Sequence, residues 1–236
     1  GVLVDMVRNQ YNEQLAELKS LLTEMGDLNS QAIAQVVAAL KSPAIPPRKE
    51  GELYGSVSVV RAIKRYENAV DEKESEIERL CLKLIIRQQP VASDLLFITS
   101  AMKMITDMER IADQAVDISE LVVKMSGLKE GEIPEEMSAM ADAVQKMVVG
   151  VMQAFTERSE QKAREICRAD DVVDECFIKI KTKLTSVMHR SGDEGGNERA
   201  LDLLMVAKYL ERIGDHAVNI AEWVLFSLTG EHKKLG

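Results

Sequence analysis

The strongest constraint on the fold of this chain is a motif that occurs twice. The sequence ERIADQAVDISE at 109–120 returns as ERIGDHAVNIAE at 211–222, with eight identical residues in twelve. A second pair, ENAVDE at 67–72 and DDVVDE at 170–175, recurs at nearly the same separation. Self-similarity of this kind indicates two copies of one structural unit. We therefore predict two tandem repeats, over 1–128 and 129–236.

Long amphipathic windows fill both repeats. Apolar residues recur at three- and four-residue spacing and aromatic residues make up only 4% of the 236-residue chain, which favours helices over strands. We predict three helices in the first repeat, over about 6–41, 57–88 and 93–125, the third capped by Ser93 or Asp94. In the second repeat, the fourth helix begins at Pro134 and meets the fifth near Ser159, and the sixth ends near 229. The predicted connections are SPAIPPRKEGELYGS at 42–56, the turn at Pro90, LKEGEIP at 128–134 and HRSGDEGGNE at 189–198. The fold class is all-α, with two antiparallel three-helix bundles and six long helices.

Carboxylates stand four residues apart in each motif. Asp71 and Glu109 are each 19 residues from Pro90, and Glu67 and Asp113 are each 23 residues from it. Residues equidistant from the turn of an antiparallel hairpin lie at about the same height, so we expect these four acids to face one another.

The second repeat gives the same match. Asp174 and Glu211 are equally far from the point between residues 192 and 193, and so are Asp170 and Asp215. We therefore expect each of these pairs to lie at the same height. Glu109 and Glu211 each interrupt a stripe of otherwise apolar or small residues. Carboxylates gathered at such positions are destabilised by repulsion and desolvation unless they are protonated, paired or bound to cations.

Ion pairing with neighbouring bases such as Arg110 and Arg212 is the ordinary explanation of an acidic helix face. Four height-matched and duplicated motifs favour metal binding instead. Carboxylate oxygens suit Mg²⁺, Mn²⁺, Fe or Ca²⁺, whereas Zn²⁺ is disfavoured because no Cys or His occupies a motif position. Further candidate ligands adjoin the motifs: Asp117, Glu72 and Glu175.

Several classes of protein are excluded or disfavoured. A net charge of −9 without a basic run argues against nucleic-acid binding. The Glu-x-x-His signature of ferritin-like di-iron bundles is absent, and so are phosphate-binding loops and nucleophile elbows. His216 aligns with Gln114, outside the duplicated pattern. Three cysteines without CxxC spacing, no secretory signal and no membrane-spanning apolar run predict a cytoplasmic protein.

The motifs DMERIADQAVDI and YLERIGDHAVNIAE, with RQQPVASDLLFITSAMKM before the first, resemble the PhoU phosphate-signalling family over nearly the whole chain. The resemblance implies two three-helix bundles that carry metal clusters on the acidic motifs. It also implies a regulator, not an enzyme, that links the ATPase of the phosphate ABC transporter to a sensor histidine kinase and restrains phosphate uptake and starvation signalling. The ligands implied by position are Glu67, Asp71, Glu109 and Asp113 in the first repeat, and Asp170, Asp174, Glu211 and Asp215 in the second.

We therefore expect a metal-binding adaptor that meets the membrane only through its partners and that is compatible with a homo-oligomer. One alternative is a metal-dependent hydrolase or redox enzyme that uses the same carboxylates, for which no general base is evident. Another is a helical spacer whose acids are merely salt-bridged. The insertion at 42–56 has no counterpart in the second repeat.

Overall fold

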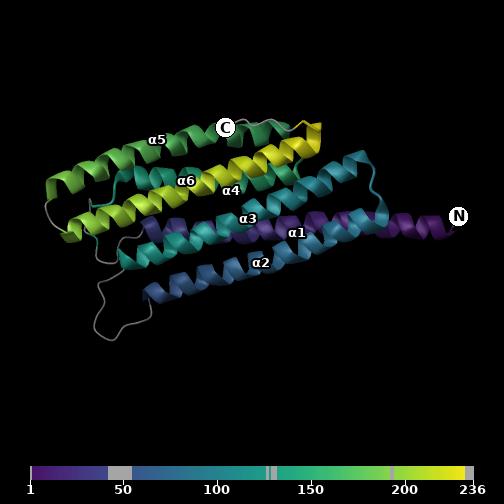
Figure 1. Ribbon diagram of the computed structural model, residues 1–236, viewed down its shortest axis with the longest axis horizontal. Coiled ribbons are helices and arrows are strands. Elements are labelled where there is room, and N and C mark those ends of the chain that lie inside the picture. Colours follow the sequence, from purple (N-terminus) through teal and green to yellow (C-terminus); the bar gives the residue numbers. More distant parts are fainter. Residues whose placement is uncertain (1, 42–54, 126–127, 129–131, 192–193, 232–236) are drawn as a thin grey trace.

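The computed structural model describes residues 2–41, 55–125, 128, 132–191 and 194–231 (Figure 1). Six helices make up almost all of this described part: α1 (Val2–Lys41), α2 (Gly55–Gln88), α3 (Ala92–Lys124), α4 (Glu135–Thr156), α5 (Glu160–Ser191) and α6 (Glu194–Thr229). The predicted all-α class is confirmed.

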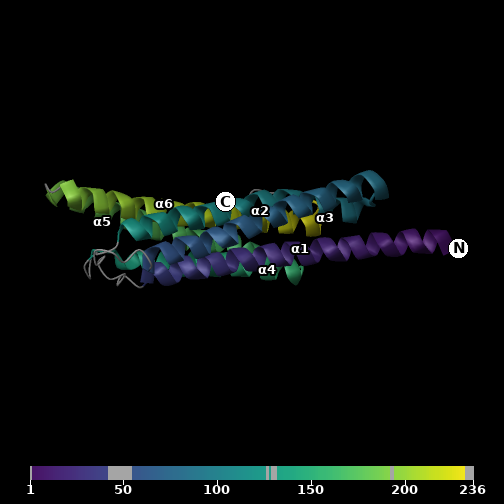
Figure 2. The same ribbon diagram turned by 90° about the horizontal axis from the view of Figure 1, so that it is seen from below.

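The helices form two groups of three. Helices α1, α2 and α3 pack on one another, as do α4, α5 and α6. Contacts of α3 with α6 and of α1 with α4 join the groups, so α2 and α5 are the outermost helices (Figure 1). In Figure 2, α1 and α4 form one layer in the lower part of the view, and α3, α5 and α6 lie above them. The two predicted three-helix bundles are present, and their division between residues 128 and 129 stays a prediction.

The core follows the helical period along α1. Leu18, Leu22, Met25 and Ile33 are fully buried at steps of three, four and eight residues, which places them on one side of the helix. Asn29 falls in the same stripe, and its Nδ2 donates a hydrogen bond of 2.9 Å to the carbonyl of Met108 on α3. A buried polar group needs such a partner, so this bond fixes α1 against α3 at one height.

The contact between α3 and α6 relates the two repeats. Asp107 Oδ1 on α3 lies 2.8 Å from His216 Nδ1 and 3.1 Å from Asn219 Nδ2 on α6. Further along the same antiparallel pair, Arg212 acts on Asp117 and opposes the rise in its pKa that burial causes. An approximate twofold axis therefore passes between these contacts, near the equivalent positions 112 and 214.

The turn between α4 and α5 confirms the helix boundary predicted near Ser159. The backbone N–H of Lys162 donates to Ser159 Oγ at 3.2 Å, which is the N-cap arrangement for α5. Just before it, the N–H groups of Arg158 and Ser159 donate to the carbonyls of Phe155 and Ala154 at 3.2 and 2.9 Å. These bonds end α4 and reverse the chain within three residues.

Ser159→Ala should lower stability by about 1 kcal/mol, because it removes this cap from α5. For a chain of this length that corresponds to a fall in melting temperature of roughly 2–4 °C. Thermal unfolding followed by circular dichroism measures it. Ser186→Ala on the same helix is the control, since Ser186 Oγ only donates to the carbonyl of Thr182 within the helix. Equal effects of the two substitutions would refute the capping role.

Two helix starts differ from prediction. Helix α3 begins at Ala92 with Val91 as an N-cap that makes no side-chain bond. The predicted cap by Ser93 or Asp94 is wrong, and Asp94 instead accepts a 2.8 Å hydrogen bond from the Tyr11 hydroxyl. The separator predicted at 189–198 is too long, because α5 continues to Ser191 and α6 already begins at Glu194.

Part of the insertion predicted at 42–56 lies outside the described residues, which resume at Gly55 with α2. None of the helices in the described ranges has both the length and the hydropathy needed to cross a membrane.

Candidate metal centres

The first acidic cluster lies where α2 packs on α3. Burial is the main cause that raises the pKa of Glu67 on α2, followed by the charges of Asp71 and Asp113. Burial also raises the pKa of Asp71, and Asp113 on α3 adds to it. The structure therefore brings Glu67 and Asp71 to Asp113 across the two helices, as the height match predicted for Glu67.

The register of this cluster differs from prediction by a few residues. Asp71 meets Asp113, and the acid on α2 that acts on Glu109 is Glu74. Side chains on a helix tilt toward its N-terminus, so in an antiparallel pair the side chains that meet are offset from those of equal Cα height. Counting from Pro90 ignored this tilt. Glu74 was missed, although its position three residues after Asp71 on the same face could have indicated it.

Glu109 is the most perturbed acid of the first cluster. Burial, then repulsion from Asp113, raises its pKa to about 7, and Arg110 opposes the shift. Asp117 lies at the edge of this cluster, where burial first and then Asp113 raise its pKa. Asp117, the further candidate ligand on α3, thus lies close to the four acids predicted for the first repeat.

The second cluster lies where α5 packs on α6 and matches the predicted pairs. Burial and then Glu211 raise the pKa of Asp174. Burial, Asp174 and then Asp215 raise the pKa of Asp170 to about 6. The pKa of Asp215 is raised by burial first and by the charge of Glu211 second. Asp170, Asp174, Glu211 and Asp215 therefore form one group across the helix pair.

Asp170 carries the clearest sign of a missing partner. Its Oδ1 is buried and accepts no hydrogen bond in the structure. A Cβ added at Gly214 on α6 would lie 3.0 Å from this oxygen, so the glycine lets the carboxylate approach the helix backbone. A buried carboxylate oxygen without a partner is unfavourable, and a proton or a cation would relieve it.

Ion pairs neutralise the clusters only in part. Arg110 lies 3.4 Å from Glu109 and 3.2 Å from Asp113, and Lys208 pairs with Glu211. Each of these bases is on the same helix as its acid. In the part of the chain that the structure describes, no ion pair involves the cluster acids of the outer helices, although other acids there, such as Glu76 and Glu175, are paired with lysines. These cluster acids are Glu67, Asp71, Glu74, Asp170 and Asp174. The salt-bridge explanation therefore covers a minority of the carboxylates.

No three carboxylate, thiol or imidazole groups among the described residues converge closely enough to hold an ion as they stand. Repulsion between uncompensated carboxylates favours such separated side chains, and a cation would have to draw them together. Glu72 and Glu175 face solvent, and Glu175 lies 3.8 Å from Lys179. The ligand sets thus stay predictions, with the cross-helix proximity of the acids as their structural support.

The donors available are carboxylate oxygens, which suit hard cations such as Mg²⁺ and Mn²⁺ and also iron. His216 is held by Asp107 rather than aimed at an acid cluster. The three cysteines are buried and unpaired. Burial raises the pKa of Cys81 to about 12, so this thiol stays protonated at neutral pH in the metal-free protein.

Comparison with known protein families gives one consistent match. The PhoU domain model matches residues 51–122 and 137–224, that is, segments of both repeats. A relative from Clostridium acetobutylicum, named phosphate-specific transport system accessory protein PhoU homolog, is 33% identical over 98% of this chain and 99% of its own length.

Similar solved structures also come from PhoU proteins. The crystal structure of PhoU from Pseudomonas aeruginosa aligns with a TM-score of 0.81 at 29% identity, over 94% of this chain and 100% of that one. A phosphate transport system regulatory protein PhoU from Streptococcus pneumoniae aligns with a TM-score of 0.79 at 24% identity, over 94% and 99% of the two chains, and supports the fold alone.

Proposed function

Because this chain belongs to the PhoU domain family, we propose that it is an accessory protein that regulates a phosphate-specific transport system. The observation that carries this proposal is the match to an accessory protein of that system over 98% of the chain. The acidic motifs of both repeats lie within the matched segments.

In finer terms, we propose a cytoplasmic negative regulator that contacts the transporter ATPase and a sensor histidine kinase. Its role would be to present a binding surface rather than to catalyse a reaction. The outer helices α2 and α5 support this, because among the described helices each contacts only the other two of its own bundle. The ATPase is the partner we expect to be bound most directly, since relatives are named as accessory to transport.

We further propose that each acidic cluster binds one or more cations, with Mn²⁺, Mg²⁺, Fe or Zn²⁺ as candidates. Glu67, Asp71, Glu109 and Asp113 would hold the metal in the first bundle. Asp170, Asp174, Glu211 and Asp215 would hold it in the second. The bound metal would supply positive charge and no reaction chemistry.

The residues themselves suggest what this charge does. Acids of α2 and α3 repel one another where the two helices pack, as do those of α5 and α6, so each helix pair is held together against a local electrostatic penalty. Neutralising that charge would fix the outer helix on the inner one and so define the surface offered to a partner. Elemental analysis of the purified protein tests for bound metal directly.

The enzymatic alternative finds little support at these sites. Hydrolysis would need a general base beside an open metal position. Among the described residues, His216 follows Asp215 in the sequence, but its Nδ1 lies 2.8 Å from Asp107, which belongs to neither candidate ligand set. We therefore propose no catalytic role.

Affinity capture from phosphate-replete cells tests the regulatory role. The protein loaded with Mn²⁺ should recover the phosphate transporter ATPase, identified by mass spectrometry, and recovery should fall at least several-fold when a chelator strips the metal. Glu13→Gln/Glu17→Gln, which removes two exposed acids of α1 four residues apart, is the matched control and should recover as much as the wild type. Failure to enrich the ATPase or the kinase under any of these conditions would refute the proposal.

A further inference from the structure

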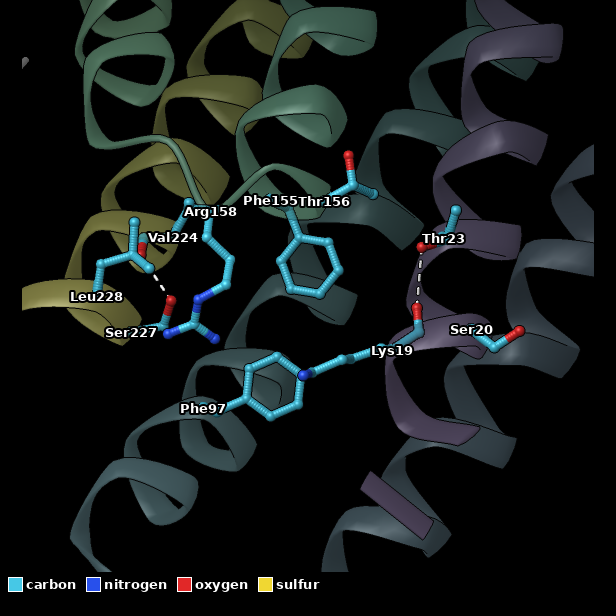
Figure 3. Close-up of a pocket in the computed structure, with 10 residues that line it drawn as sticks. All are labelled: Lys19, Ser20, Thr23, Phe97, Phe155, Thr156, Arg158, Val224, Ser227 and Leu228. Carbon is cyan, nitrogen blue, oxygen red and sulfur yellow. Dashed lines mark hydrogen bonds between the residues drawn. The ribbon is translucent and has the colours of Figure 1, made fainter. Parts of the chain in front are cut away.

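A cavity of about 320 Å³ lies at the seam between the two bundles (Figure 3), and its lining residues include none of the cluster acids. It is bordered by α1 and α3 from the first bundle, and by α4, α6 and the α4–α5 turn from the second. The lining residues are Lys19, Ser20, Thr23, Phe97, Phe155, Thr156, Arg158, Val224, Ser227 and Leu228. Its volume is at the lower end of the range for small-molecule sites, about 300–1,000 Å³.

Two aromatic rings and two cations define the chemistry of this seam pocket. The rings of Phe97 and Phe155 are stacked at 14°, with centroids 6.0 Å apart. Lys19 Nζ lies 5.6 Å from the centroid of Phe97. Figure 3 shows Lys19 and Arg158 extending into the pocket from opposite sides, from α1 and from the α4–α5 turn. The pocket thus has an aromatic wall between two positive charges.

Neither cation has an acidic partner in the part of the chain that the structure describes. Among the described residues no ion pair involves Lys19 or Arg158, whereas other bases of this acidic chain, such as Lys73 and Lys183, are paired with carboxylates. A cation on an aromatic face is attracted to the ring, but the ring does not neutralise its charge. Two such cations that extend into one hollow favour an anionic ligand.

The hydroxyl groups of the pocket do not compete for that ligand as donors. Ser20 donates to Glu24 at 3.2 Å, Thr23 to the carbonyl of Lys19 at 2.9 Å, and Ser227 to that of Val224 at 2.7 Å. Thr156 donates to the carbonyl of Met152 at 3.1 Å. An anion would therefore be held by the ammonium and guanidinium groups.

The backbone of Arg158 adds an independent observation. Its φ is 52°, in the left-handed region that glycine usually occupies after a helix end. A non-glycine residue is strained there, and such outliers concentrate at functional sites. Arginine at this position is understandable if its side chain is needed in the pocket.

We propose that the seam pocket binds a small organic anion with an aromatic ring. The ring would pack on Phe97 and Phe155, and a carboxylate or phosphate group would be held between Lys19 and Arg158. Each bundle contributes one ring and one cation, so an occupied pocket would tie the two bundles together. This site shares no residue with the acidic clusters and does not depend on the regulatory role.

Calorimetric titration of the full chain with three probes tests the proposal. Phenyl phosphate carries both the ring and the anion, inorganic phosphate only the anion, and phenol only the ring. Phenyl phosphate should bind at least tenfold more tightly than either of the others. No binding of phenyl phosphate, or equal binding of inorganic phosphate, would overturn the proposal.

Substitutions locate the site. Lys19→Gln and Arg158→Gln should each weaken phenyl phosphate binding at least fivefold. Lys179→Gln, which removes one exposed positive charge on α5 outside the pocket, should leave binding unchanged. Arg158→Gly separates binding from folding, because it should abolish binding while its melting temperature stays at or above that of the wild type. Unchanged binding in the Lys19 and Arg158 variants would overturn the assignment.

Discussion

Addition of Mn²⁺ to the metal-free protein should raise its stability, and the gain should fall when either acidic cluster is neutralised. A ligand that binds only the folded state stabilises it by about 2.7 kcal/mol per site when its concentration is a hundred times Kd. Here the gain has a definite source, since the cation would relieve the desolvation and repulsion that raise the pKa values of Glu67, Asp170 and their neighbours.

Amide variants isolate each cluster. Glu109→Gln/Asp113→Asn should remove the gain that comes from the first bundle, and Glu211→Gln/Asp215→Asn that from the second. Amides keep the size of the side chains but remove the charge. Differential scanning calorimetry with and without chelator measures the gain, and elemental analysis measures the metal retained. Glu13→Gln/Glu17→Gln on α1 is the control and should behave as the wild type. Protein that binds no metal after reconstitution, with the same melting temperature in every variant, would refute the metal centres.

Without metal, stability should decrease as the pH rises from about 5 to about 7.5. Burial and repulsion from Asp113 raise the pKa of Glu109 to about 7 in the folded protein, from the ordinary 4.5 of a glutamate. Asp170 has a pKa of about 6, raised by burial and by Asp174 from 3.8. Between the unfolded and folded values the native state binds more protons than the unfolded chain, so the free energy of unfolding falls with pH.

The expected size of this decrease is about 2 kcal/mol. A shift of one pKa unit corresponds to about 1.4 kcal/mol, and solvent screening at these partly exposed grooves reduces the sum. Urea unfolding at pH 5, 6, 7 and 8 in the presence of chelator measures it. Glu109→Gln should flatten the profile, because the amide does not titrate. Saturating Mn²⁺ should reverse the trend, since metal binding requires deprotonated ligands. A metal-free protein that gains stability over this pH range would contradict the electrostatic account.

Sequence reasoning predicted the architecture because the signals were long and consistent. Stripes such as Leu18, Leu22 and Met25 on α1 set the buried faces, and the repeat of 109–120 at 211–222 set the pairing of the two bundles. Helix ends were less accurate. Helix α3 begins at Ala92 without a side-chain cap, and Asp94 instead accepts a hydrogen bond from Tyr11 on α1, 83 residues away in the chain.

The acidic clusters were predicted to within a helical turn. Height matching found the pairs of α5 and α6, where Asp174 acts with Glu211. It missed Glu74 on α2, because the direction of side chains along a helix does not follow from counting Cα positions. It also could not indicate that Gly214 lets the Asp170 carboxylate sit against the backbone of α6.

The seam pocket left no signal in the sequence. Its residues come from α1, α3, α4, α6 and the α4–α5 turn, and they meet only when the two bundles dock. Lys19, Phe97 and Arg158 each have an ordinary local context, apart from an arginine where a helix end favours glycine.

The outer position of α2 and α5 has a consequence for how this protein can vary over time. Among the described residues α2 contacts only α1 and α3, and α5 contacts only α4 and α6. A substitution on either outer helix therefore changes one acidic cluster and leaves the other untouched. The two halves already differ at matched positions, for example at Asp117 and Asn219. Selection can act on the two halves as separate traits within a single folded chain.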